Sequence, residues 1–207
     1  MEINKFEWNR QLFHIFLGIG IVLLLMYGFI GITVVIYGFK IPYADVLLII
    51  IIGLLISLLS KRINIPIICN LLQKFERKND LAKFPGKGFI FYFIGAYIAL
   101  LLFEKEIAMA SIMVLALGDS ISHLYGLHFG KIKHPLSKVK FLEGTIAGFI
   151  AGFIGAFVFL PWWESVLASS AAMIVEAFEI KIGTQQVDDN LIIPFVAGAV
   201  VWLVRAF

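Results

Sequence analysis

The segment Ala116–Gly144, ALGDSISHLYGLHFGKIKHPLSKVKFLEG, joins two apolar runs through a short basic loop. Asp119 lies inside the first run, four lysines occupy the loop, and Glu143 precedes the second run. Ionisable groups inside membrane helices are costly and rare, so they are functional candidates by default. We therefore interpret the segment as two membrane helices with a charged site at the end that they share.

The composition of the whole chain indicates an integral membrane protein. Of the 207 residues, 61% are hydrophobic, and the mean hydropathy is +0.97, whereas soluble domains are about 45–50% apolar. The length favours a single membrane-embedded domain over residues 1–207. The single cysteine, Cys69, excludes an internal disulfide framework. We expect no cleavable signal peptide, because the apolar run after Phe13 is too long and lacks a small-residue cleavage site.

Apolar runs near the ~20 residues needed to cross a bilayer predict about seven transmembrane helices. The predicted spans are Leu12–Gly31, Tyr43–Ser60, Gly88–Phe103, Ile107–Leu127, Thr145–Leu160, Ser165–Ile180 and Leu191–Phe207. The stretch Ile32–Ile41 is expected either to extend the first helix or to form a re-entrant piece. Residues Ile67–Phe75 predict a short amphipathic helix in the membrane interface, with a solvated loop as the alternative. The predicted fold class is an all-α integral membrane protein.

The distribution of the 17 Lys and Arg residues orients these helices. All of them except Lys40, Lys105 and Arg205 fall on the same side of the membrane as the N-terminus. By the positive-inside bias, that side is cytoplasmic. The same pattern supports an odd number of helices, because removing one helix would scatter the charges.

The candidate site residues gather at the cytoplasmic end of the predicted helices. At a rise of ~1.5 Å per residue, Asp119 lies about 20 Å from the outer end of its helix, and Glu176 lies about 18 Å along its own. The residues that begin helices on the cytoplasmic side are His14, Glu143, Asp188, Asp189 and Asn190. We therefore expect these groups to share one face and a similar depth.

Each of these residues also has a structural explanation. Asp188, Asp189 and Asn190 suit helix capping, and Glu143 suits a helix N-terminus. Asp119 has His123 one turn away as a possible partner, and Glu176 is open to internal pairing.

Small residues recur every four positions in the fifth predicted helix, at Gly144, Gly148, Gly152 and Ala156. This spacing lets another helix approach closely. The functional alternative is a groove beside this helix that holds a lipid chain.

Together the carboxylates and cations predict divalent-metal and phosphate chemistry. Mg²⁺ typically takes one or two carboxylates plus substrate phosphates, and lysines bind phosphate as point charges. The loop supplies Lys131, Lys133, Lys138 and Lys140, and Gly126 and Gly130 would let the backbone approach an anion. The chain has no Walker motif and no protein-kinase signature set, so a nucleotide site must be of another kind.

Short motifs along nearly the whole chain resemble those of the polyprenol kinase family. They are Arg10-Gln11-Leu12-Phe13-His14, Leu117-Gly118-Asp119 followed by Gly126 and Gly130, Lys140-Phe141-Leu142-Glu143-Gly144, Glu176, and Asp189-Asn190-Leu191-Ile192-Ile193-Pro194. The family includes dolichol kinase, phytol kinase and the CTP-dependent diacylglycerol kinase, and is related to phosphatidate cytidylyltransferases. One departure is Phe141, which stands where the family has Ser or Thr and so removes a hydroxyl that could touch metal or phosphate.

The resemblance implies transfer of the γ-phosphoryl group of a nucleotide, usually CTP, to the hydroxyl of a lipid alcohol. A polyprenol, dolichol, geranylgeraniol or phytol type of alcohol is expected, at the cytoplasmic face of the cell membrane. Such transfer needs mainly positioning and charge neutralisation. The expected partners are therefore a nucleoside triphosphate, a lipid alcohol and the bilayer, and no nucleic acid.

The resemblance also implies roles for individual residues. Asp119 and Glu143 would hold Mg²⁺, with Asp189 as a third candidate ligand. Catalytic roles extend to Lys140, Asp189, Asn190, Glu176 and His14, and the base that accepts the alcohol proton is Asp119, Glu176 or His14. The nucleotide would be bound by Gly126, Gly130, Lys131, Lys138, Lys140 and Asn190.

Two other functions stay open on the sequence. A cytidylyltransferase would make a CDP-lipid from a phosphatidate-like lipid. A transporter or channel would also use buried carboxylates, but its polar groups should span both halves of the membrane, and the outer half is nearly free of them.

Overall fold

The computed structural model describes residues 5–63, 66–137, 139–178, 180–182 and 185–207. The helices within these ranges are α1 (Lys5–Met26), α2 (Ala44–Ser60), α3 (Pro66–Phe75), α4 (Lys78–Lys83), α5 (Lys87–Leu102), α6 (Lys105–Met113), α7 (Ser120–Phe129), α8 (Leu142–Phe157), α9 (Trp162–Ala177) and α10 (Asp189–Ala206). A π-helical turn, η1 (Val114–Asp119), links α6 to α7. Two hairpins pair β1 (Val34–Ile36) with β2 (Phe39–Ile41) and β3 (Lys181–Ile182) with β4 (Gln185–Gln186).

A helix occupies each of the seven predicted spans, and α6, η1 and α7 together fill one of them. Three continuous helices are long and apolar enough to cross a membrane, namely Lys5–Met26, Lys105–Phe129 and Asp189–Ala206, and α2, α5 and α8 are shorter apolar helices. The described chain is thus a helical membrane protein. That all seven helices cross the bilayer, with the N-terminus in the cytoplasm, stays a prediction.

The stretch Ile32–Ile41 is neither an extension of α1 nor a re-entrant piece, and this prediction was wrong. It forms the β1–β2 hairpin, in which Val34 pairs with Ile41 and Ile36 with Phe39. The two residues at its tip, Tyr37 and Gly38, have φ angles of 49° and 85°. A two-residue turn with positive φ at both positions matches the twist of antiparallel strands, so Tyr-Gly between β-branched residues favours a hairpin over a helix.

The helix formed by α6, η1 and α7 lies at the centre of the bundle. In the most apolar stretch of this helix, 78% of the residues are buried, against 33% in the corresponding stretches of α1 and α10. Side chains of α6 and η1 such as Ile107, Ile112 and Leu115 belong to the hydrophobic core. The helix contacts α1, α8, α9 and α10, so Asp119, at the end of η1, is held by a rigid and well-packed element.

The two faces of α8 have opposite roles. A Cβ atom at Gly148 would lie 2.7 Å from the carbonyl oxygen of Gly118, and one at Gly144 would lie 2.6 Å from that of Ser122. The opposite face exposes Ile146, among other isoleucines. The packing interpretation of the glycine spacing is therefore confirmed. The alternative groove beside this helix is wrong, because α7, η1 and α9 fill the glycine face.

The amphipathic segment is helical, as α3, and the alternative of a solvated loop is wrong. Ile68, Leu72 and Phe75 are half-buried along one side of α3, whereas Gln73 and Lys74 are exposed. Its predicted place in the membrane interface stays a prediction.

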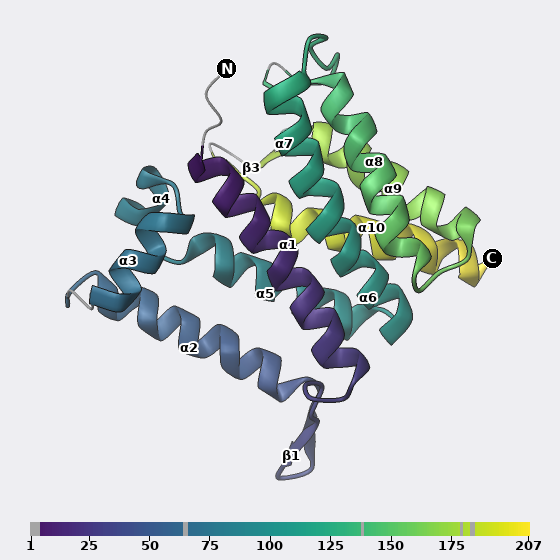
Figure 1. Ribbon diagram of the computed structural model, residues 1–207. Helices are drawn as coiled ribbons and strands as arrows, with labels where there is room; N and C mark the ends of the chain where they lie inside the picture. Colours follow the sequence, from purple (N-terminus) through teal and green to yellow (C-terminus); the bar gives the residue numbers. More distant parts are fainter. Residues whose placement is uncertain (1–4, 64–65, 138, 179, 183–184) are drawn as a thin grey trace.

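The long helices run in alternating directions, with α6, η1 and α7 counted as one, and this gives the bundle two chemically different ends (Figure 1). At one end, Arg205 of α10 makes a two-pronged ion pair with Glu164 of α9 at 3.0 and 2.8 Å, and it also pairs with Glu104 at 3.1 Å. Glu164 is only 3% exposed. This end is thus a neutralised structural clamp, and the candidate residues lie at the other end.

Candidate functional site

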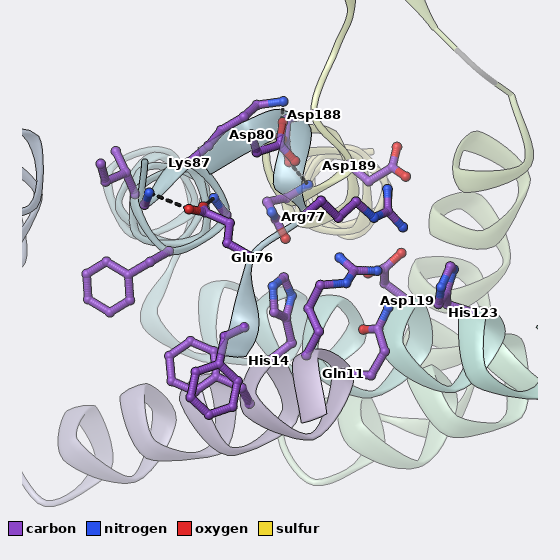
Figure 2. A pocket seen from close by; sticks show the side chains of 18 of the residues that line it. Gln11, His14, Glu76, Arg77, Asp80, Lys87, Asp119, His123, Asp188 and Asp189 are labelled. Carbon is purple, nitrogen blue, oxygen red and sulfur yellow. Dashed lines mark hydrogen bonds and ion pairs between the residues drawn. The ribbon is translucent and has the colours of Figure 1, made fainter. Parts of the chain in front are cut away.

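A cavity of about 750 Å³ opens at the end of the bundle opposite the Arg205 clamp. Its walls come from the starts of α1, α5 and α10, the ends of α2 and α9, helices α3 and α7, and the loop before α8. Figure 2 shows His14 and Gln11 reaching into this pocket from α1, with Asp119, Asp188 and Asp189 around it. The structure thus brings Gly126 and six other predicted site residues to one cavity. The six are His14, Asp119, Lys140, Glu176, Asp189 and Asn190.

Lys140 links the carboxylates of α9 and α10. Its Nζ donates to Glu176 Oε1 at 2.6 Å and lies 3.4 Å from Asp189 Oδ2. Burial lowers the pKa of Lys140, but the nearby carboxylates of Glu176, Asp189 and Asp119 outweigh that effect and raise it above its usual value. The ammonium group therefore stays charged at neutral pH, as a phosphate-neutralising group must.

Glu176 has an internal partner, as its structural explanation predicted. Its side chain is 3% exposed and pairs with Lys140 through Oε1. The other oxygen, Oε2, is buried with no hydrogen-bond partner in the described part of the chain. A buried oxygen without a donor costs stability, so its retention calls for a functional explanation.

Asp119 does not pair with His123, so the structural alternative for Asp119 is wrong. His123 Nε2 instead contacts Glu7 Oε2 of α1 at 3.1 Å, and Arg10 also binds this carboxylate at 3.0 Å. Within the described residues, no hydrogen bond or ion pair holds the carboxylate of Asp119. It is half-buried at the cavity wall, where it remains able to bind a cation or accept a proton.

The first turn of α10 combines capping with ion pairing. Asp188 accepts from the backbone N–H of Asn190 at 3.2 Å, so its capping role is confirmed. Its other oxygen lies 3.1 Å from Lys87 Nζ of α5. This contact fixes α10 against α5, where Gly95 leaves space for the carbonyl of Asn190.

Four predicted nucleotide or metal residues fall outside the cavity lining or the described chain. Glu143 accepts from the backbone N–H groups of Lys131 and Ile132, both at 3.1 Å, and so ties down the loop before α8. Glu143, Lys131 and Gly130 do not line the cavity. Lys138 lies outside the described residues.

Phe141 explains the glycines around it. Its ring lies against Gly130, where a Cβ atom would come within 2.3 Å of Phe141 Cγ, and it holds Lys133 Nζ 4.0 Å from the ring centre. Gly126 faces Gly144 across the α7–α8 contact. The space beside Gly130 is therefore filled by protein, whereas Gly126 also lines the cavity. The anion-binding role of both glycines stays a prediction.

Sequence reasoning missed several polar side chains at the cavity. Gln11 is 1% exposed, and its Oε1 has no partner among the described residues. Gln11 lies three residues before His14 and therefore on the same face of the helix, and this spacing was the signal that could have identified it. Lys87 and Arg77, which resembled simple topology determinants, also line the cavity.

Sequence analysis missed Glu76 because this residue lies in the polar stretch that follows α3 and belongs to no recognisable motif. Its carboxylate accepts from the N–H groups of Gly86 and Gly88 at 2.6 and 3.0 Å, at the start of α5. Burial raises the pKa of Glu76, and these two donors offset part of that rise. Glu76 thus holds the end of α3 against α5 and closes one side of the cavity.

The carboxylates at the cavity do not form a complete metal cage. Among the residues that the structure describes, no three His, Cys, Asp or Glu side chains come together as a metal site. Asp119 and Asp189 both line the cavity. This donor set fits Mg²⁺, which needs one or two carboxylates when substrate phosphates and water complete its shell.

Comparison with known proteins gives three informative relatives. An uncharacterised protein of Methanocaldococcus jannaschii is 30% identical over 153 residues, which cover 73% of this chain and 75% of that protein. CTP-dependent diacylglycerol kinase 1 of Schizosaccharomyces pombe is 28% identical over 56% of this chain and 60% of its own. Phytol kinase 1 of Arabidopsis thaliana, a chloroplastic protein, is 29% identical over 60% of this chain.

The chain spans only about half the length of these two kinases, 60% of the first and 46% of the second. No family model matches the chain, and no solved structure matches it significantly.

Proposed function

Because this chain belongs to the polyprenol kinase family, we propose that it transfers the γ-phosphoryl group of a nucleotide to the hydroxyl of a lipid alcohol. CTP is the proposed donor, and a polyprenol, dolichol, geranylgeraniol or phytol type of alcohol is the proposed acceptor. The reaction is proposed to take place at the cytoplasmic face of the membrane. The relatives named for CTP-dependent diacylglycerol and phytol phosphorylation support this assignment.

One observation carries the proposal: a single cavity joins a half-buried cation, apolar walls and a carboxylate that has no hydrogen bond or ion pair in the described part of the chain. Asp119 supplies the carboxylate, and Lys140 supplies the cation. Phosphoryl transfer requires charge neutralisation and positioning more than covalent protein chemistry. A cavity that meets both needs at a membrane surface suits a water-soluble nucleotide and a membrane-bound alcohol.

The reaction assigns a task to each group. The alcohol oxygen bonds to the γ-phosphorus, the bond to the bridging oxygen breaks, and a nucleoside diphosphate leaves. Lys140 neutralises charge on the phosphates, and Asn190 orients a phosphate or a bound water. The alcohol proton passes to Asp119, Glu176 or His14, which all line the cavity; Glu176 and His14 are not among the residues proposed to hold Mg²⁺.

Magnesium is part of the proposal. Asp119 and Asp189 would hold it together with the phosphates, and the ion would neutralise phosphate charge. Glu143 stays a candidate ligand, although its carboxylate here serves the loop backbone. A chelator should therefore stop turnover, and added Mg²⁺ should restore it.

The direct test uses purified protein, Mg²⁺ and nucleotide labelled in the γ-phosphate, with a panel of prenols and diacylglycerol. Label in the lipid product supports a kinase. Absence of phosphorylated lipid from both CTP and ATP would refute the proposal. Incorporation of label from the α-phosphate but not from the γ-phosphate would indicate a cytidylyltransferase instead.

Two variants test the proposed metal residues. Asp119→Asn should abolish turnover and leave the melting temperature nearly unchanged, because the carboxylate has no hydrogen bond or ion pair among the described residues to lose. Glu143→Gln should abolish turnover if Glu143 reaches the metal. Near-normal activity of either variant would remove that residue from the metal site.

A further inference from the structure

The cavity has an apolar limb beside its charged wall. Apolar side chains from α1, α2, α3 and α5 line it, namely Phe13, Ile56, Ile68, Leu71, Leu72 and Phe89. The lining beside the limb also carries charges, of which Glu76 accepts from the N–H groups of Gly86 and Gly88 and Lys87 pairs with Asp188. The remaining charged lining residues come from α1, η1, α7, α9, α10, the α3–α4 connection with α4, and the loop before α8. The phosphates of a nucleotide are suited to the charged part, whereas a hydrocarbon chain gains free energy by leaving water for the apolar limb.

Helix α3 gives the limb its cover. Ile68, Leu72 and Phe75 lie at i, i+4 and i+7, which makes one apolar stripe along the helix. Such a stripe normally packs against the core, but here all three side chains line the cavity. The ring of Phe75 stacks on that of Phe13 of α1, with centroids 4.8 Å apart. Helix α3 is thus anchored to α1 at one end, with its apolar face above an open space.

The limb lies where two helices diverge. Figure 1 shows the end of α1 and the start of α2 together near the β1–β2 hairpin, and the two helices spread apart toward α3 and α4. Between them, on α2, Ser57 is 2% exposed, and its hydroxyl has no hydrogen-bond partner among the described residues. The neighbouring Leu55 and Leu58 are exposed on the outer surface, which suits contact with lipid. The limb therefore lies directly behind a surface of α2 that faces the bilayer.

We propose that the hydrocarbon chain of the lipid alcohol lies in this limb, between α2, α3 and α5, and leaves between α1 and α2 into the bilayer. The hydroxyl then points toward His14 and Asp119, and α3 covers the chain. The inference rests on the proposed kinase function, which supplies a lipid with one polar end. It also makes Ile56 and Leu72 determinants of the chain length that the enzyme accepts.

Photolabelling of the unmodified protein tests the place of the chain. The probe is a geranylgeraniol analogue with a diazirine near the middle of its chain, added to protein in liposomes. Label should appear in α2 and α3 and should disappear when excess geranylgeraniol is added. Competed label confined to other helices, or no competed label, would overturn the proposal.

A pair of variants tests chain-length selection. Ile56→Trp fills the limb, whereas Leu55→Trp places the same ring on the exposed outer face of α2. Ile56→Trp should lower kcat/KM for geranylgeraniol by about tenfold or more, while values for short geraniol and for the nucleotide change less than about twofold. Leu55→Trp should leave all three unchanged. Equal losses for both alcohols, or equal losses in both variants, would contradict the limb as the chain site.

The two measurements separate this inference from the kinase proposal. Competed label in α2 and α3 without any phosphorylation would support the chain site and refute the kinase. Phosphorylation with competed label elsewhere would support the kinase and refute the chain site. Labelling of the unmodified protein decides the matter even if Ile56→Trp does not fold.

Discussion

Replacing Lys140 by methionine removes the cation that joins α9 to α10. Methionine keeps the length of the side chain but leaves Glu176, which is 3% exposed, without its partner at 2.6 Å. At an effective dielectric constant of about 20, that pair attracts by about 6 kcal/mol, and Asp189 at 3.4 Å adds about 5 kcal/mol. Desolvation offsets part of this attraction, so we expect a net loss of about 3–5 kcal/mol.

Thermal unfolding in detergent measures this loss. At about 2–4 °C per kcal/mol, Lys140→Met should lower the melting temperature by on the order of ten degrees. The double variant Lys140→Met/Glu176→Gln should recover most of the loss, because the glutamine carries no charge. Its turnover should nevertheless stay roughly a hundred- to a thousandfold below that of the unmodified protein, since the phosphates have lost their cation.

The matched control is Lys133→Met in the same loop. Lys133 contacts the ring of Phe141 but does not itself line the cavity. Its loss should therefore cost about 0.5–1 kcal/mol and leave turnover unchanged. The ion-pair reasoning would be refuted if Lys140→Met melted like the unmodified protein. It would also be refuted if the double variant were no more stable than Lys140→Met.

Three further variants test the packing of the bundle. Arg205→Ala leaves Glu164 buried without its cation and should cost about 3–5 kcal/mol in thermal unfolding, with turnover per folded molecule unchanged because the clamp is at the far end. Gly95→Ala should cost about 1–3 kcal/mol, because its Cβ would lie 2.0 Å from a carbonyl oxygen of α10. Gly20→Ala, with open space around it, is the control and should be neutral or stabilising by up to about 1 kcal/mol. Phe141→Ser restores the family's hydroxyl but removes the ring over the α7–α8 loop, so limited proteolysis should cut this loop faster; unchanged cleavage would contradict the packing role of the ring.

The helices and their convergence follow from the sequence alone. Long apolar runs can satisfy their backbone hydrogen bonds in lipid only as helices or closed barrels, and short connections make neighbouring helices antiparallel. Residues at alternate ends of successive runs must then meet at one end of the bundle. This is why Asp119, Glu176 and Asp189 could be placed together before any coordinates, although their sequence separations reach 70 positions.

The partners of these residues depend on the tertiary structure. Which side chain faces which depends on the rotation of each helix about its axis, and the π-helical turn η1 shifts that rotation just before Asp119. His123 therefore reaches Glu7, and Asp119 is left without a hydrogen bond or ion pair among the described residues. Apolar periodicity does not encode such rotations to the accuracy that a hydrogen bond requires.

The basic loop between α7 and α8 also shows that the sequence supplies the charges and the tertiary structure decides their partners. The four lysines of the basic loop are equivalent in sequence, but the packing of α8 against α7 sends Lys140 to the carboxylates of α9 and α10 and Lys133 to an aromatic ring. Glu143 turns back to the loop backbone. Composition and order along the chain thus determined which end of the membrane bundle carries the charged site. Helix rotation and packing decided which of those charges meet, because ion pairs need contact within a few ångströms.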